Sequence, residues 1–149
     1  MAERAIIVRS GQPKAHVTPY GDTIAFVVGE AETHEGFSLH ERVAPPGSRS
    51  TPHLHRKYVE AFYVVEGALS ITVEEEEIAA GAGTFVLVPK RATHAWKNDG
   101  PGDARVLVMF APSQTRAYFE ELDALSAELK AGRANAGDFA ALARKYNQD

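Results

Sequence analysis

Apolar and β-branched residues recur along the first three quarters of the chain in short clusters, and glycine, proline, asparagine and aspartate separate them. Short apolar clusters bounded by such turn residues are typical of strands, and no helical period runs through this region. Many short strands with regular turns predict an all-β sandwich or barrel. The expected strands cover residues 5–8, 24–28, 37–43, 61–65, 69–73, 85–88 and 106–110.

The pattern changes after residue 112, where proline and β-branched residues become rare. Apolar residues three and four positions apart predict one amphipathic helix, with Ser113 as its N-cap and Gly132 as its stop, and a second helix from Asp138. We expect residues 1–112 to form the β domain and residues 113–149 a helical extension packed on its outside, with a dimer contact as the alternative. The helix stripes are Phe119, Leu122, Leu125 and Leu129, then Phe139, Leu142, Ala143 and Tyr146.

Composition and charge exclude several classes of protein. The chain has 149 residues, no cysteine and a formal net charge of −4, so disulfides, thiolate chemistry and a basic footprint for nucleic acid are excluded. The longest apolar run, residues 106–111, is far too short to span a membrane, and the charged start does not resemble a signal peptide. We therefore expect a cytoplasmic protein. The glutamate run at residues 74–77 is interpreted as a solvated hairpin tip.

Three histidines and one glutamate form a candidate metal site. His53 and His55 are two positions apart, which on a strand puts both imidazoles on one face, roughly 6–7 Å apart. Glu60 follows at an odd spacing that would turn it away, but the charged pair at residues 56–57 offers a bend that restores its facing. His94 lies in another strand-like segment. Spacing alone leaves open whether these residues bind a transition metal or are surface histidines.

The wider sequence resembles the first motif of the cupin family. That motif consists of a glycine, a His-x-His pair, a glutamate and a second glycine at fixed spacing. Gly47, His53, His55, Glu60 and Gly67 meet every one of its positions.

The second cupin motif consists of a glycine, Pro-x-Gly, a histidine and an asparagine. Gly83, Pro89, His94 and Asn98 match it at the expected spacing. Arg91 stands where the family usually has a glycine that serves a turn, so the loop geometry departs from the pattern without loss of a metal ligand.

The resemblance implies a cupin double-stranded β-helix, or jelly-roll barrel, with a C-terminal α-helical extension. It also implies that His53, His55, Glu60 and His94 hold one divalent transition metal, which could be Fe, Mn, Ni, Co, Cu or Zn. Open coordination positions on such a metal suit catalysis. The alternative is a cupin that has kept these residues without a metal.

Strand alternation predicts which side chains share the cavity with the ligands. Trp96 and Asn98 should face inward with His94, and Phe62 with Glu60. An aromatic-lined cavity suits an apolar or aromatic substrate, although small barrels also fill their interiors with such side chains simply to pack. Further candidates for the wall are Phe26, Phe37 and His40, of which His40 could orient a ligand, act as a general base or face solvent.

Three functions are compatible with this pattern. The first is a dioxygenase for an aromatic or enolic substrate, resembling the quercetin-dioxygenase-like cupins, with Glu60 as the catalytic group that accepts the substrate proton. The second is a metal-dependent isomerase, lyase or hydrolase without redox chemistry. The third is a barrel that binds a ligand without catalysis. In each case we expect a small-molecule partner and a homodimer, because small barrels leave edge strands that a second copy can cover.

Overall fold

The apolar clusters form nine strands in the computed structural model, which describes residues 3–114 and 116–146. Six of the seven predicted clusters lie within or overlap a strand, so the turn residues placed the element boundaries well. The strands are β1 (Ala15–Val17), β2 (Thr23–Val28), β3 (Ser38–Ala44), β4 (Val59–Glu66), β5 (Ala68–Val73), β6 (Glu76–Gly81), β7 (Phe85–Val88), β8 (His94–Lys97) and β9 (Ala104–Ala111).

The exception is the cluster at residues 5–8, where the structure has no strand and Ile6 and Ile7 are exposed. A strand needs a partner for its backbone groups, and this segment has none among the described residues. At β6 a strand forms where the sequence predicted only a hairpin tip, because the glutamate run at residues 74–77 is divided between the turn and the strand. Glu76 and Glu77 belong to the strand, because β6 pairs in register with β5 along its whole length.

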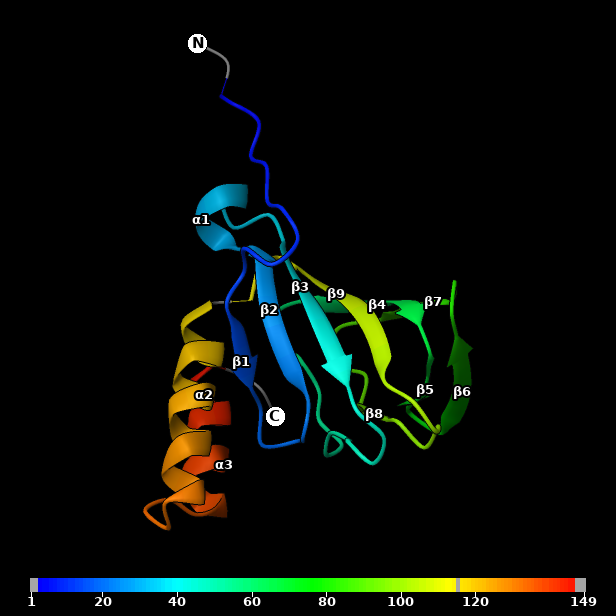
Figure 1. Ribbon diagram of the computed structural model, residues 1–149, viewed down its shortest axis with the longest axis vertical. Coiled ribbons are helices and arrows are strands. Elements are labelled where there is room, and N and C mark those ends of the chain that lie inside the picture. Colours follow the sequence, from blue (N-terminus) through cyan, green and yellow to red (C-terminus); the bar gives the residue numbers. More distant parts are fainter. Residues whose placement is uncertain (1–2, 115, 147–149) are drawn as a thin grey trace.

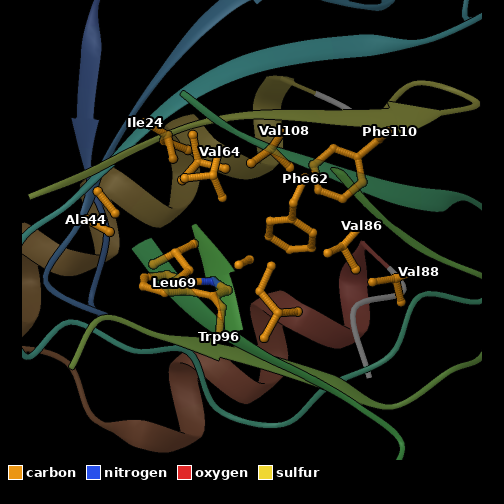
Figure 2. Close-up of a cluster of buried hydrophobic side chains, with 14 of the residues drawn as sticks. Ile24, Ala44, Phe62, Val64, Leu69, Val86, Val88, Trp96, Val108 and Phe110 are labelled. Carbon is orange, nitrogen blue, oxygen red and sulfur yellow. The ribbon is translucent and has the colours of Figure 1, made fainter. Parts of the chain in front are cut away.

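The strands form two antiparallel sheets (Figure 1). The larger has the order β1-β2-β3-β9-β4-β7, and the smaller has the order β6-β5-β8. Their inner faces meet in one apolar core, in which Phe62 and Val108 of the larger sheet face Leu69 and Trp96 of the smaller one (Figure 2). The ladders of the described residues give these two facing sheets and do not by themselves close into the barrel that the resemblance implies.

Alternation along the strands decides what reaches the core. On β9 the residues Ala104, Val106, Val108 and Phe110 are buried, and the residues between them are only partly covered. β3 shows the same period, with its buried positions at Ser38, His40, Arg42 and Ala44. Two of those four are basic, so this strand carries polar groups into the interior.

Within the described residues three helices complete the fold: α1 (Glu30–Thr33), α2 (Arg116–Lys130) and α3 (Ala136–Lys145). α2 begins three residues after the predicted cap Ser113. α3 begins two residues before Asp138, because Asn135 is its N-cap and Asp138 closes the capping box from the third helical position. The predicted stripe on α2 buries Phe119 and Leu122, half-buries Leu125 and leaves Leu129 exposed.

The two C-terminal helices lie beside β1 at one side of the larger sheet (Figure 1). Buried side chains of α2 and α3 belong to the same apolar cluster as the strand core. Residues 1–2, 115 and 147–149, which fall inside the two predicted segments 1–112 and 113–149, lie outside the described residues. None of the helices in the described part of the chain is long and apolar enough to cross a membrane.

Gly67 should be the glycine that this fold tolerates changing least. Its φ is +74°, and an added Cβ would lie 2.4 Å from the backbone oxygen of Asp103, which cannot move aside. We predict that Gly67→Ala lowers the free energy of unfolding by about 3 kcal/mol, from overpacking and left-handed strain together. Gly83→Ala is the matched control, because its φ is +87° but its Cβ would meet nothing within 4 Å. It should cost only about 1 kcal/mol. Equal losses in denaturant titrations would contradict this prediction.

Candidate metal centre

Two of the histidines meet because residues 48–53 run antiparallel to β8. His53 and His94 form a β-bridge in which each backbone N–H donates to the other's carbonyl, at 3.0 and 2.8 Å. Residues directly opposite each other across such a pair project to the same face. Their ring centroids are consequently only 4.4 Å apart.

The other two donors follow from the bend between them. His55 lies two positions after His53 and accepts a hydrogen bond at its carbonyl from the Arg91 N–H, at 2.8 Å. The chain then bends at residues 56–57, as the charged pair there predicts. Glu60 enters β4 on its inner face, between β7 and β9. The odd spacing from His55 to Glu60 is therefore absorbed by this bend.

The four donor atoms converge. One nitrogen from each of His53, His55 and His94 and one carboxylate oxygen of Glu60 all lie within 4.8 Å of one another. Glu60 Oε2 is 2.8 Å from the Nε2 atoms of both His55 and His94. His55, Glu60 and His94 are buried and His53 is half-buried, so the cluster is reached from the side of His53.

Hydrogen bonds on the far side of two rings select the nitrogen that faces the cluster. Nδ1 of His53 donates to the carbonyl of Thr51 at 2.7 Å, and Nδ1 of His94 donates to that of Ala92 at 3.0 Å. In the neutral rings this leaves a lone pair on each Nε2. At His94 that lone pair would face a carboxylate oxygen, an arrangement that requires a proton or a cation between them. The donor set therefore fits a divalent transition metal.

The electrostatics agree with this reading. Burial opposes ionisation of Glu60, but hydrogen bonds and positive charge from His55 and His94 hold its pKa well below the usual range. Burial also disfavours a charged ring at His94, yet the contact with Glu60 raises the pKa of His94 above its ordinary value. At His53 burial dominates and lowers the pKa to about 4. The cluster thus keeps a buried carboxylate ionised among three imidazoles, which favours a positive charge beside it.

A cavity of about 150 Å³ adjoins the cluster. His53, His55 and Glu60 form part of its wall, so a molecule in the cavity would lie next to the donors. The wall also contains residues of α2 and α3, which means that the helical extension covers the cavity as well as packing on the sheet. Its other lining residues are Thr18, Tyr20, Arg42, Ser50, Thr51, Pro52, Trp96, Phe110, Gln114, Tyr118, Phe119, Leu122 and Ala143.

Trp96 is the one predicted pocket residue that lines this cavity. Phe62 and Asn98 face inward as the alternation predicts, but they lie elsewhere in the interior. Phe62 packs in the apolar core between the sheets (Figure 2). Asn98 holds a turn, since its amide donates to the carbonyls of Ala44 and Gly102 at 2.7 and 2.9 Å. Inward facing therefore does not suffice to place a side chain at the cavity.

Three further pocket candidates do not reach the cavity wall. Phe37 precedes β3 and is 40% exposed. Phe26 is buried on β2, with its ring centroid 5.0 Å from that of Phe119, which stands in the cavity wall. His40 is fully buried and packs against Phe26, Phe110 and Phe119. Burial lowers the pKa of His40 to about 3, so the ring is neutral. The ring is not exposed to solvent, and it does not line the cavity.

Sequence reasoning missed the residues that the extension and β3 bring to the cavity. Arg42 could have been predicted as an inward-facing candidate, because it lies two positions after His40 on a predicted strand and its side chain points to the same face of the sheet. Gln114, Tyr118 and Phe119 carried no such signal. The helical period showed that a face of α2 is apolar but not what that face covers.

The departure at Arg91 also has a structural outcome. Its φ is +69°, the left-handed conformation for which a glycine is usual at this point of the second motif. The turn forms nevertheless, and the Arg91 N–H donates to the His55 carbonyl. The substitution thus leaves the four donors in place.

Comparisons with known proteins agree with these features. The model of the cupin domain family matches residues 40–110, which run from β3 to β9 and include both motifs. The quercetin 2,3-dioxygenase of Bacillus subtilis is 28% identical over 117 residues, which are 78% of this chain but only 34% of that protein. The chain therefore spans about a third of the length of that relative. The polyketide synthase CurC of Streptomyces cyaneus is 29% identical over 90 residues, 58% of each chain.

The fold has solved counterparts as well. A predicted oxalate decarboxylase from Thermotoga maritima superposes with a TM-score of 0.67 at 18% identity, over 71% of this chain and 98% of that one. At this identity the likeness concerns the fold alone. The two motifs and the match of the cupin domain model over residues 40–110 identify the segment from β3 to β9 as a cupin domain.

Proposed function

We propose that this protein is a metal-dependent oxygenase that acts on a small aromatic or enolic substrate. The observation that carries the proposal is the convergence of four metal-ligating donors, three of which stand in the wall of a cavity that is also lined by aromatic side chains. The likeness to a quercetin 2,3-dioxygenase supports the reaction class. We propose His53, His55, Glu60 and His94 as the ligands of one divalent transition metal.

Imidazole and carboxylate donors accept Fe, Mn, Ni, Co, Cu and Zn, so the ligand set does not select among them. When bound, such a metal would supply a Lewis acid and, if it is redox-active, a route for electrons between substrate and O₂. A metal that takes more than four ligands would keep positions for a substrate beyond these four donors.

The side chains of the cavity have three roles in this proposal. Phe110, Phe119 and Trp96 would hold an aromatic or enolic body and exclude water from it. Glu60 would accept the substrate proton, and because its pKa is held low it is a weak base, which suits an enol or a phenol better than an ordinary alcohol. Burial raises the pKa of Tyr118, so its hydroxyl stays neutral and can donate a hydrogen bond to a substrate oxygen.

A second candidate is a metal-dependent isomerase, lyase or hydrolase without redox chemistry. The same four donors would then hold a metal that polarises a carbonyl. A third candidate, a ligand-binding cupin without turnover, uses the same cavity. We also propose a cytoplasmic location and a homodimer, the latter because β6 and β7 are edge strands of their sheets, with no further strand beside them among the described residues.

Oxygen consumption separates these candidates. We predict that the protein loaded with Fe²⁺, Mn²⁺, Ni²⁺, Co²⁺ or Cu²⁺ consumes O₂ with at least one member of a panel of flavonols, diketones, catechols and enolic acids, as measured with an oxygen electrode. Zn²⁺-loaded protein, which has the same charge but no redox chemistry, is the control. Product formation under anaerobic conditions with Zn²⁺ would instead establish the non-redox candidate and contradict the oxygenase.

Removing two of the ligands should remove the metal. We predict that His53→Ala combined with His55→Ala lowers bound metal from about one ion per chain to less than a tenth, because the two remaining donors cannot chelate at micromolar concentration. His34→Ala is the control, since His34 is exposed and pairs with Glu3 away from the cluster. Elemental analysis of purified protein is the measurement. Unchanged metal content in the double variant would refute the ligand assignment.

We predict that the affinity for metal falls as the pH is lowered, because the histidine ligands become protonated. Protons compete for the Nε2 lone pairs, and the raised pKa of His94 means that this competition begins at a higher pH than it would for an ordinary histidine. The affinity for Ni²⁺ should therefore drop by about tenfold or more per pH unit below pH 6. His53, with its pKa of about 4, should steepen the loss only near that pH. Calorimetric titration between pH 7 and 4 tests this, and an affinity that stays constant from pH 7 to 5 would contradict it.

A further inference from the structure

One cationic side chain in the cavity wall is not explained by metal binding. Arg42 lies at a core-facing position of β3, is only 7% exposed and lines the same cavity as Glu60 and Trp96. A charged group at such a position loses its hydration and therefore needs compensating partners inside the protein.

Part of that compensation comes from Asp22, which is fully buried. Arg42 Nε lies 2.8 Å from Asp22 Oδ2, an ion pair whose alignment is too poor for a hydrogen bond between these two atoms. Asp22 itself accepts a hydrogen bond from the Thr18 hydroxyl. The guanidinium carbon of Arg42 stands 4.6 Å from the ring centroid of Trp96. One edge of the guanidinium is thus held by a carboxylate and one face by the indole, which fixes its orientation.

The remaining donor capacity of Arg42 is unused within the described residues. Its Nη1 atom is buried and makes no hydrogen bond there. The Oε1 atom of Gln114, in the wall of the same cavity, is buried and also lacks a partner. A buried polar group that is left unpaired loses its hydration without any return from the protein. A donor and an acceptor that both go unsatisfied around one cavity indicate a ligand with a matching acceptor and donor.

Charge and size narrow the class of ligand. With a divalent metal bound, the carboxylates of Asp22 and Glu60 offset two of the three positive charges that Arg42 and the metal contribute, and one positive charge remains. A monoanion would neutralise the site. The cavity of about 150 Å³ is close to the size that holds a single benzene ring, and so is too small for a three-ring flavonol.

We infer that Arg42 binds a carboxylate of the substrate above Trp96, and that the substrate is a small aromatic or enolic carboxylic acid with a body of about one ring. Guanidinium and carboxylate have matching planar geometry, which an amide or alcohol of the same shape lacks. This inference rests on the proposal that the cavity is the substrate site.

Trp96 provides a direct readout, because it is the single tryptophan of the chain and lies against Arg42. Benzoate and benzamide, which have the same ring and nearly the same shape, are titrated into Zn²⁺-loaded protein while the fluorescence of Trp96 is followed. We predict that benzoate binds at least tenfold more tightly than benzamide.

The test variant is Arg42→Gln combined with Asp22→Asn, which removes both charges so that neither is left buried alone. With the same metal bound, its preference for benzoate should fall by at least tenfold. Arg105→Gln combined with Glu41→Gln is the matched control: it removes both charges of another ion pair, at residues that do not line this cavity, and should keep the full preference. Arg42→Lys, which keeps the charge beside Asp22 but loses the planar fork, replaces the test variant if that protein does not fold, and should lose at least threefold.

The inference is overturned if benzoate gives no saturable change in the wild-type protein, if benzamide binds equally well, or if the preference of the test variant falls less than threefold. These outcomes are separate from those of the proposed function. A benzoate preference that depends on Arg42 in a protein without oxygen uptake would support the inference and refute the oxygenase, whereas oxygen uptake with neutral substrates alone would do the reverse.

Discussion

The arrangement of this protein depends on one buried negative charge. The Glu60 carboxylate lies on the inner face of β4, where a charge without partners would cost several kcal/mol. His55 and His94 supply these partners at 2.8 Å, although they lie five positions before Glu60 and 34 positions after it. The bend after His55 and the pairing of residues 48–53 with β8 are what bring them there. A cation among these donors completes the same compensation.

A second buried ion pair repeats this logic in the wall of the same cavity. Asp22 directly precedes β2, Arg42 lies in the neighbouring strand β3, and the Trp96 ring covers the guanidinium. The wall also contains aromatic side chains, and some of them belong to α2. The cavity thus offers a site for metal ligation, an apolar body and a fixed cation within one small volume, which is the arrangement expected for a small organic anion.

Much of this could be predicted from the sequence because it rests on local rules. Turn residues marked the ends of six strands, and apolar residues three and four positions apart predicted α2. The alternation of side chains along a strand predicted that Trp96, Asn98 and Phe62 face inward, and all three are buried. The same rule could not say where inside each would lie. Asn98 holds a turn and Phe62 fills the core, because the interior is larger than the cavity and alternation reports only the face.

The sequence by itself determined the donor residues, their spacing and the bend that lets Glu60 face them, since these depend on residue type and strand period along a short stretch. Only the tertiary structure decided that α2 and α3 form part of the cavity wall and that residues 5–8 do not pair with a sheet. It also decided that Arg42 lies against the ring of Trp96. The physical reason is that each of these depends on contacts between segments far apart in the chain. Their free energy comes from packing and charge compensation across the fold, which no local pattern encodes.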